Sequence, residues 1–457
     1  MGPVLLSIDG GEENEEDDDE DEETPGITKA YRRVLRRCLA ISPSAIEALV
    51  LLSTKTTPGV LAENEDLLVT LAAYTEPSQP WVPSKETSGK ANQLLRDLLA
   101  ANNTTQDQFI VQNILQHHLR PLFSKSKPSS ITSSGRKVEY VDPSAGRGEG
   151  IPDDSNETKP WKFSDFRAFP LASYCVNQAD ETLIAKQWAL FLPVLLTLTD
   201  DSTTLIRLQG LQTLTTFLRK FPAKTLHDTG LSKVFEDAIF PTLSYLPSLT
   251  PEAESIQLLT PAFEALQVLA SKQLPSTTST SPSGSNKEQI KVLDKLLREG
   301  VFTAYFHAKY HVRIVKVLCE QTVLILNTMG IYAVKHLKDL IPMLSSILSD
   351  PFAPAAPATL LSATKALLAV LANCWPRIPD SPWQDEITQA IVLCWLNVRE
   401  GSTAVTTSSS AAIRHELLTT VKCLSAVLKA GGTNLAEVAK PLVDKEPALR
   451  ELFSPSG

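Results

Sequence analysis

Apolar side chains recur at helical spacing through most of the chain. In residues 205–218 they stand at positions 208, 211, 214 and 218, which places one apolar stripe along a helix. The same spacing appears at 256–269, 337–348, 360–371 and 413–428. The alternation typical of a strand occurs only briefly, at 138–141. The pattern therefore predicts an all-α protein.

The order of these helices predicts a repeat. Residues 192–201 and 340–350 each contain a proline and end in aspartate, and each is followed by an amphipathic stretch that stops at a second proline, Pro222 or Pro376. Antiparallel helix pairs of this kind recur every ~40 to 47 residues in HEAT and armadillo proteins. Residues 312–326 are apolar on nearly all sides, as suits a helix covered by neighbours on both flanks. We therefore expect an α-solenoid of degenerate HEAT/armadillo-like helix pairs.

Composition marks the breaks between the helical regions. We expect a disordered acidic tail at 1–26, an N-terminal helical region at 27–123, a flexible linker at 124–160 and a HEAT-like α-solenoid at 161–453. Within the solenoid, residues 275–287 contain no apolar side chain and predict a disordered insertion.

The net charge of −9 is concentrated in the tail. Eleven of the 52 acidic residues stand between positions 12 and 23, and the other 41 nearly balance the 43 Lys and Arg residues. The folded body is therefore close to neutral, which gives no support for a nucleic-acid surface.

Four arginines follow the tail and share one helical face: Arg32, Arg33, Arg36 and Arg37. The acidic run can fold back on this face, or the face can meet an acidic partner or calmodulin. A simply solvated helix face is the third interpretation.

The cysteines and the apolar runs indicate where the protein works. Six cysteines are scattered without a CxxC pair, as in a reducing compartment. No secretory leader is expected, since the first ten residues lack a basic start. The longest apolar run, 188–198, is shorter than the ~20 residues that span a bilayer, so no membrane association is expected. The expected location of the protein is therefore the cytoplasm, the nucleus or both.

No catalytic or cofactor motif stands out. The chain has neither a GxSxG nucleophile elbow nor a phosphate-binding GxxxxGK[ST] loop. His307 and His311 have the spacing of a helical zinc pair, but Ala308 stands where a metalloprotease carries its glutamate. Asp200 and Asp201 are expected to cap the next helix, and Cys374 to be a packed thiol. We therefore expect neither enzyme activity nor a bound metal or cofactor.

An ordered series of short segments between about 180 and 430 resembles a known family. It comprises residues 192–201, Arg207–Leu211, 229–238, 241–252, 342–352 and 374–377. The series is similar to that of the Tel-two-interacting protein two family, whose members are HEAT-repeat components of the triple-T cochaperone complex.

The resemblance implies a non-enzymatic scaffold that binds the other two triple-T subunits, of the Tel-two and Tti-one types. It implies that this assembly works with Hsp90 and the R2TP adaptor to stabilise phosphatidylinositol-3-kinase-related kinases. Candidate partner-binding residues lie at two inter-repeat turns, Asp200, Asp201 and Arg207 at one and Trp375, Pro376 and Arg377 at the other, because Trp and Arg are common at interface hot spots. The alternative is structural: Trp375 is buried between repeats and Arg207 ties adjacent turns.

Two other functions remain open at this point. One is a different HEAT adaptor, such as a nuclear-transport receptor or a phosphatase scaffold, because fold does not fix function. The other is an enzyme with an unrecognised helical active site.

Overall fold

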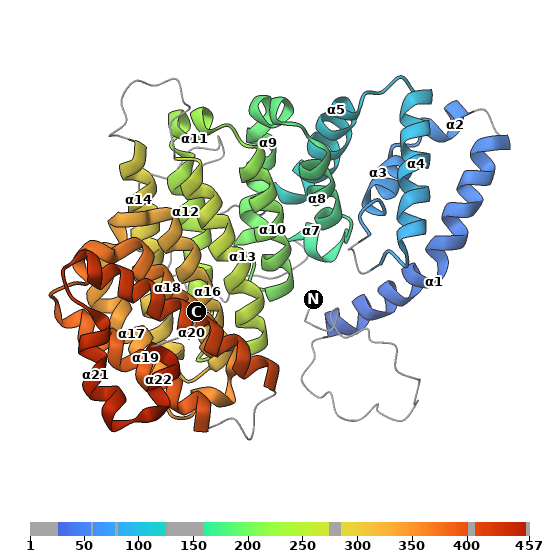
Figure 1. The fold of residues 1–457 in the computed structure, drawn as a ribbon. Coiled ribbons are helices and arrows are strands. Elements are labelled where there is room, and N and C mark those ends of the chain that lie inside the picture. Colours follow the sequence, from blue (N-terminus) through green and yellow to red (C-terminus); the bar gives the residue numbers. More distant parts are fainter. Residues whose placement is uncertain are drawn as a thin grey trace. The chain divides into compact units, whose positions relative to one another are not determined.

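The computed structural model describes residues 26–55, 58–77, 81–124, 126, 159–273, 285–400 and 407–453. Helices connected by short turns make up these residues, and no strand occurs in them. The predicted all-α class is therefore confirmed (Figure 1). The acidic run at 12–23, the strand-like segment at 138–141 and most of the predicted linker lie outside the described residues.

The chain forms two compact units that divide between Pro241 and Thr242. Composition predicts the main break at 124–160 instead. The helices on either side of that linker pack together, with α8 (Ala168–Gln178) against α3 (Glu65–Ala73) and η2 (Phe109–Leu119). The contact between them places both in one unit.

The first unit comprises helices from both sides of the linker. They are α1 (Gly26–Lys55), α2 (Pro58–Ala62), α3, α4 (Lys85–Ala101), α5 (Gln106–Gln108), η2, α6 (Arg120–Phe123), α7 (Pro160–Phe163), α8, α9 (Glu181–Thr199), α10 (Thr204–Lys220), α11 (Ala223–Thr229) and α12 (Leu231–Ile239).

Side-chain caps fix where several of these helices begin. Asn64 accepts a hydrogen bond from the backbone N–H of Leu67, Ser84 from that of Thr87, and Asp180 from that of Leu183. The π-helical turns of η2 bury Phe109, Ile110, Ile114, Leu115 and Leu119. The apolar stripe of η2 thus faces the interior of the unit.

Gly210 sets how closely α9 and α10 pack. A Cβ atom at this position would lie 2.7 Å from the backbone carbonyl carbon of Leu198. Only glycine allows the two backbones to approach so closely. The α9–α10 pair is the first of the two repeats predicted from the sequence.

The second unit is a two-layer stack. Its elements after η3 (Phe240–Ser244), which spans the boundary, are α13 (Glu252–Ser271), α14 (Ser285–Lys295), η4 (Leu296–Phe302), α15 (Thr303–Ala308), α16 (Val312–Met329), η5 (Gly330–His336), α17 (Leu337–Leu348), η6 (Ala353–Ala355), α18 (Pro357–Cys374), η7 (Trp375–Arg377), α19 (Pro382–Glu400), α20 (Thr407–Ala430), α21 (Leu435–Lys445), η9 (Pro447–Leu449) and α22 (Arg450–Phe453). Helix α14 begins at Ser285, so the last three residues of the predicted insertion at 275–287 belong to a helix.

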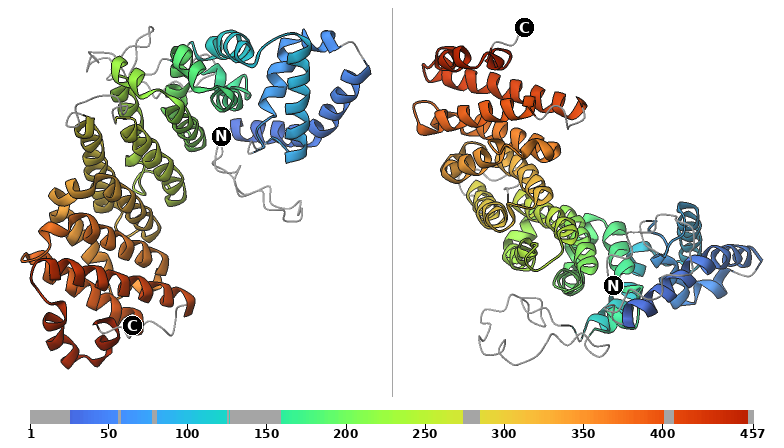
Figure 2. Two further views of the ribbon diagram at one scale, coloured as in Figure 1. Left: turned by 45° about the horizontal axis from the view of Figure 1, so that its top comes forward. Right: turned by 90° about the horizontal axis from the view of Figure 1, so that it is seen from below.

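Alternate helices form the two layers. Helices α13, α16, α18 and α20 pack side by side in one layer, and α17 and α19 pack against each other in the other (Figure 2). Helix α16 packs against α13 and α18, in agreement with the prediction of a helix covered on both flanks, but Val312 and Leu324 remain about half exposed on its open side. The second predicted repeat is the α17–α18 pair, and the α-solenoid is confirmed.

Candidate functional site

The turn between α9 and α10 brings Asp201 and Arg207 together inside the first unit. The Arg207 guanidinium donates from Nε to the main-chain carbonyl of Asp201 at 2.9 Å and from Nη2 to that of Asp200 at 3.3 Å. The Arg207 side chain is only 4% exposed. It therefore bonds the carbonyls at the end of α9 and has little surface to offer a partner.

Two lysines, Lys159 at the end of the predicted linker and Lys162 in α7, form ion pairs with the Asp201 carboxylate. Lys159 Nζ lies 2.7 Å from Oδ2 and Lys162 Nζ lies 3.3 Å from Oδ1, while the backbone N–H of Thr203 donates to Oδ1 at 2.9 Å. Burial raises the pKa of the Asp201 carboxyl, but the Lys159 hydrogen bond, the Lys162 charge and the Thr203 N–H outweigh it and lower the pKa. The cluster thereby anchors residues 159–162 to the first repeat.

The other predicted set, Trp375, Pro376 and Arg377, lies in the second unit. These residues form η7 at the end of α18, all three are exposed, and Trp375 retains 50% of its surface. Burial of Trp375 between repeats, the structural alternative, is therefore wrong. The two predicted sets belong to different compact units.

Aromatic residues at other turns of the second unit were missed by the sequence analysis. Phe306 and Tyr310 stand beside the α15–α16 turn and Phe352 stands in the α17–α18 turn, and each is more than 70% exposed. The sequence carries a signal for Phe352, an aromatic residue directly after Asp350 and Pro351, where the helical period stops.

The histidine pairs do not form metal sites. His307 lies in α15, whereas His311 precedes α16 and lies 3.9 Å from Glu252, so the two do not share a helix face. His117 pairs with Glu65 and His118 with Asp165. Within the described part of the chain, no group of three or more His, Cys, Asp and Glu side chains is placed to hold a metal.

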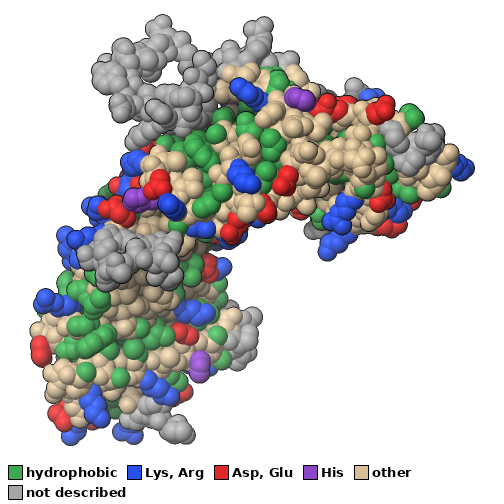
Figure 3. All heavy atoms as spheres, turned by 90° about the horizontal axis from the view of Figure 1, so that it is seen from above, with side chains coloured by type: hydrophobic (Ala, Val, Ile, Leu, Met, Phe, Trp, Pro, Cys, Tyr) green, Lys and Arg blue, Asp and Glu red, His purple; other side chains and the backbone are tan. Residues whose placement is uncertain are grey.

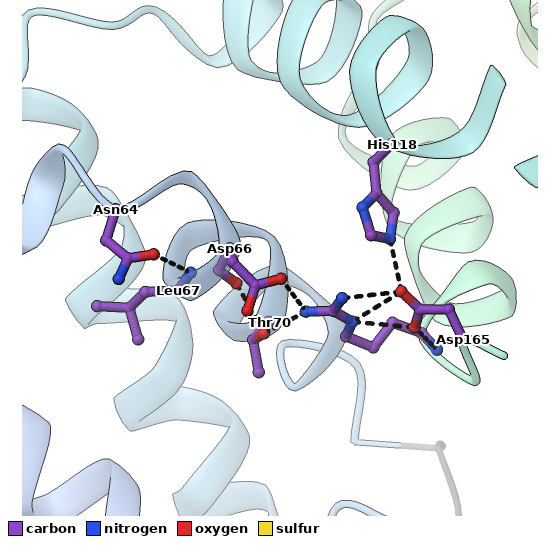
Figure 4. A network of polar contacts seen from close by, with 7 residues as sticks. Asn64, Asp66, Leu67, Thr70, His118 and Asp165 are labelled. Atoms are coloured by element: carbon purple, nitrogen blue, oxygen red, sulfur yellow. Dashed lines mark hydrogen bonds and ion pairs between the residues drawn. The ribbon is translucent and has the colours of Figure 1, made fainter. Parts of the chain in front are cut away.

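Arg167 is the centre of a polar network in the first unit (Figure 4). Its Nη1 donates to Asp66 Oδ1 and to Thr70 Oγ1, both at 2.7 Å, and its Nη2 donates to Asp165 at 2.8 Å. Burial raises the pKa of Asp165, but the hydrogen bonds from His118 and Arg167 hold that pKa well below its usual range. The network joins α3, η2 and the start of α8, which is a structural role.

The buried cysteines are unsuited to nucleophilic chemistry. Burial raises the pKa of Cys319, Cys374 and Cys394 to about 12, and it also raises that of Cys175. Thiols with such pKa values are protonated at neutral pH, and the thiolate is the reactive form. The prediction of a packed thiol at Cys374 is confirmed.

Three segments are long and apolar enough to cross a membrane by length and composition alone: Glu181–Thr199, Val312–Leu348 and Pro357–Arg377. The prediction that no segment reaches this length was wrong, because a span tolerates a few polar residues and needs no unbroken apolar run. In each, 56% or more of the most apolar window is buried inside the protein, against neighbouring helices.

Charges of both signs are mixed on one face of the protein (Figure 3). On the face drawn in Figure 3, Lys and Arg side chains stand among Asp and Glu side chains, with hydrophobic side chains between them. That face carries no broad patch of one charge, in contrast to the basic face that a nucleic-acid-binding protein presents.

Stacked helix pairs whose exposed aromatic residues stand at inter-helix turns define a helical-repeat scaffold. A family model described as the Tti2 family matches residues 67–355, well over half of the chain. The chain belongs to the Tti2 family, as the resemblance predicted. This family consists of non-enzymatic adaptors, and membership implies a subunit of the triple-T complex that associates with the other subunits. No curated protein and no solved structure matches the chain significantly.

Proposed function

We propose that this protein is the scaffold subunit through which the triple-T complex holds its other two subunits, of the Tel-two and Tti-one types. The observation that carries the proposal is the family match over residues 67–355. The architecture supports it, because stacked helix pairs provide extended surfaces that accept partner helices.

The proposal also covers the cochaperone function of the triple-T complex. With Hsp90 and the R2TP adaptor, the complex stabilises newly made phosphatidylinositol-3-kinase-related kinases, and the subunit acts in the cytoplasm and the nucleus. Its contribution is binding alone. Burial raises the pKa values of Cys175, Cys319, Cys374 and Cys394 and so favours their unreactive thiol form, which supports a binding role.

A tagged pull-down from native extract at moderate salt tests the proposal. The expected result is recovery of two other large helical-repeat proteins in stoichiometric amount, together with kinases of this class. Recovery of Ran with transport cargoes, or of phosphatase subunits, in their place would overturn the proposal and favour another HEAT adaptor. The location of the tagged chain is checked by fluorescence microscopy of living cells.

Depletion of the chain tests the cochaperone role separately. Loss of the subunit should lower the steady-state level of the client kinases without lowering their mRNA. Unchanged kinase levels after complete depletion would contradict that role even if the complex assembles.

A further inference from the structure

Three inter-helix turns of the second unit, before α13, between α15 and α16 and between α17 and α18, each expose a large apolar side chain. Leu249 precedes α13, Phe306 and Tyr310 stand beside the α15–α16 turn, and Phe352 follows α17. Their exposed fractions are 85%, 74%, 84% and 82%, the highest among the large hydrophobic side chains of the described residues. Water contact at all four positions is unfavourable, and such clusters mark interaction sites.

Contacts between the helix starts place these turns on one edge of the stack. His311 Nδ1, at the start of α16, lies 3.9 Å from Glu252 Oε2 at the start of α13. Thr359 Oγ1, at the start of α18, donates to the main-chain carbonyl of Val312 at 2.9 Å. The three turns are therefore neighbours, and we name the surface formed by Leu249, Phe306, Tyr310 and Phe352 the aromatic edge.

A hollow of about 210 Å³ lies between two of the turns. Tyr310 and Val312 line it from the α15–α16 side, and Ile347 and Ala353 line it from the α17–α18 side. The volume is sufficient for one or two aliphatic side chains of a partner.

Two exposed cations without an ion-pair partner in the described residues stand beside the aromatic edge. Lys309 and Arg313 are exposed, and neither has a carboxylate within ion-pair distance in the part of the chain that the structure describes. Lys309 Nζ lies 5.2 Å from the centroid of the Tyr310 ring. The Asp350 carboxylate accepts the N–H of Phe352 at 2.8 Å, and Glu252 faces His311. A complementary partner therefore carries acidic residues next to its apolar ones.

The spacing of the turns favours a helix as that partner. Packed helices lie about 8 to 10 Å apart. Residues i and i+7 on one face of a helix are about 10.5 Å apart along its axis. A helix lying along the edge can thus place one apolar residue against each turn. A residue between those that contact the α15–α16 and α17–α18 turns can then enter the hollow.

We propose that the aromatic edge docks an amphipathic helix of another triple-T subunit, whose acidic residues pair with Lys309 and Arg313. This inference rests on the proposed function. Exposed aromatic residues and arginine are the side chains that most often dominate interface energy.

Co-expression of the full-length chain with the other two subunits tests the docking surface. The variant with Phe306→Ser, Tyr310→Ser and Phe352→Ser should recover at least tenfold less of one subunit than wild type, with circular dichroism and melting temperature unchanged. Leu324→Ser is the matched control, because this half-exposed side chain lies 12 residues beyond Val312 on α16, about 18 Å along the helix. If the triple variant recovers as much of both subunits as the wild-type chain does, the proposal is overturned.

A photo-crosslinking amino acid in place of Tyr310 identifies the occupant. In the assembled complex it should join to a segment of another subunit with an apolar stripe and acidic neighbours. Reversing Lys309 and Arg313 to Glu should weaken binding, and Lys at the acidic positions of that segment should restore it. Crosslinks only to a second copy of this chain, or none in an intact complex, would overturn the proposal.

The two proposals fail differently. If the wild-type chain recovers neither subunit, the proposed function fails. If the wild-type chain and the triple variant recover both equally, only the docking surface fails.

Discussion

The guanidinium of Arg207 and the backbone of Asp201 are joined by a hydrogen bond of 2.9 Å from Nε to the main-chain carbonyl. The carbonyls of Asp200 and Asp201 lie beyond the last residue of α9, where the helical hydrogen bonds have ended, and Arg207 donates to both. Arg207 is one of the buried residues of α10, so this single side chain ties the turn to the second helix of the pair.

The substitution Arg207→Met tests the role of these hydrogen bonds between Arg207 and the turn. It keeps the bulk of the side chain but leaves two inward-facing carbonyls without their charged donor, which we expect to destabilise the pair by about 2 to 3 kcal/mol. Hydrogen exchange of peptides covering α9 and α10 measures the effect locally. Arg219→Met, on the exposed face of α10, is the control and should change exchange little. Equal effects of the two substitutions would contradict the role of Arg207.

Asp201 should make the first unit sensitive to acid. Its folded-state pKa is lowered, so the stability from its ionisation is present above its unfolded pKa of about 3.9 and is lost as pH falls through the folded value. We expect Asp201→Asn to cost about 3 to 5 kcal/mol at pH 7, because the buried Lys162 ammonium loses the Asp201 carboxylate. The difference between the variant and wild type should shrink below pH 4, as measured by urea unfolding of the first unit. A difference that does not depend on pH would contradict this assignment.

Gly210→Ala should loosen the α9–α10 pair. The new methyl group would meet the backbone of Leu198 at 2.7 Å, and overpacking of this kind costs about 1 to 3 kcal/mol. Gly89→Ala in α4 is the matched control, since no atom lies within 4 Å of its Cβ position, and it should stabilise by about 0.5 to 1 kcal/mol. Opposite shifts in the melting temperature of the first unit are the expected result. A stabilising Gly210→Ala would show that the backbones are not in close contact.

The turn at Trp375 remains a predicted partner contact. The exposed Trp375 and Arg377 side chains can be replaced with little effect on folding, so Trp375→Ser with Arg377→Glu should leave the melting temperature within about 2 °C of wild type. Weaker recovery of a triple-T subunit, by twofold or more at moderate salt, is the outcome expected of a contact residue. Unchanged recovery would exclude these residues from the interface.

The helical class, the paired helices and the family follow from the sequence. Leu208, Leu211, Leu214 and Leu218 recur at the helical period, and this local spacing depends on no distant residue. The aspartates that follow α9 and α17 also act locally, because Asp201 and Asp350 each accept a backbone N–H from two residues later. These features were therefore predicted from the chain alone.

The tertiary structure decided which polar and aromatic residues are covered. Asp201 was expected to cap a helix, but its partners Lys159 and Lys162 come from about 40 residues away. Trp375 is half exposed and Phe352 is almost fully exposed because the turns that carry them project beyond the helices that bury the apolar stripes. Helical period determines which face of a helix is apolar, whereas contact between distant segments determines which residues remain at the surface.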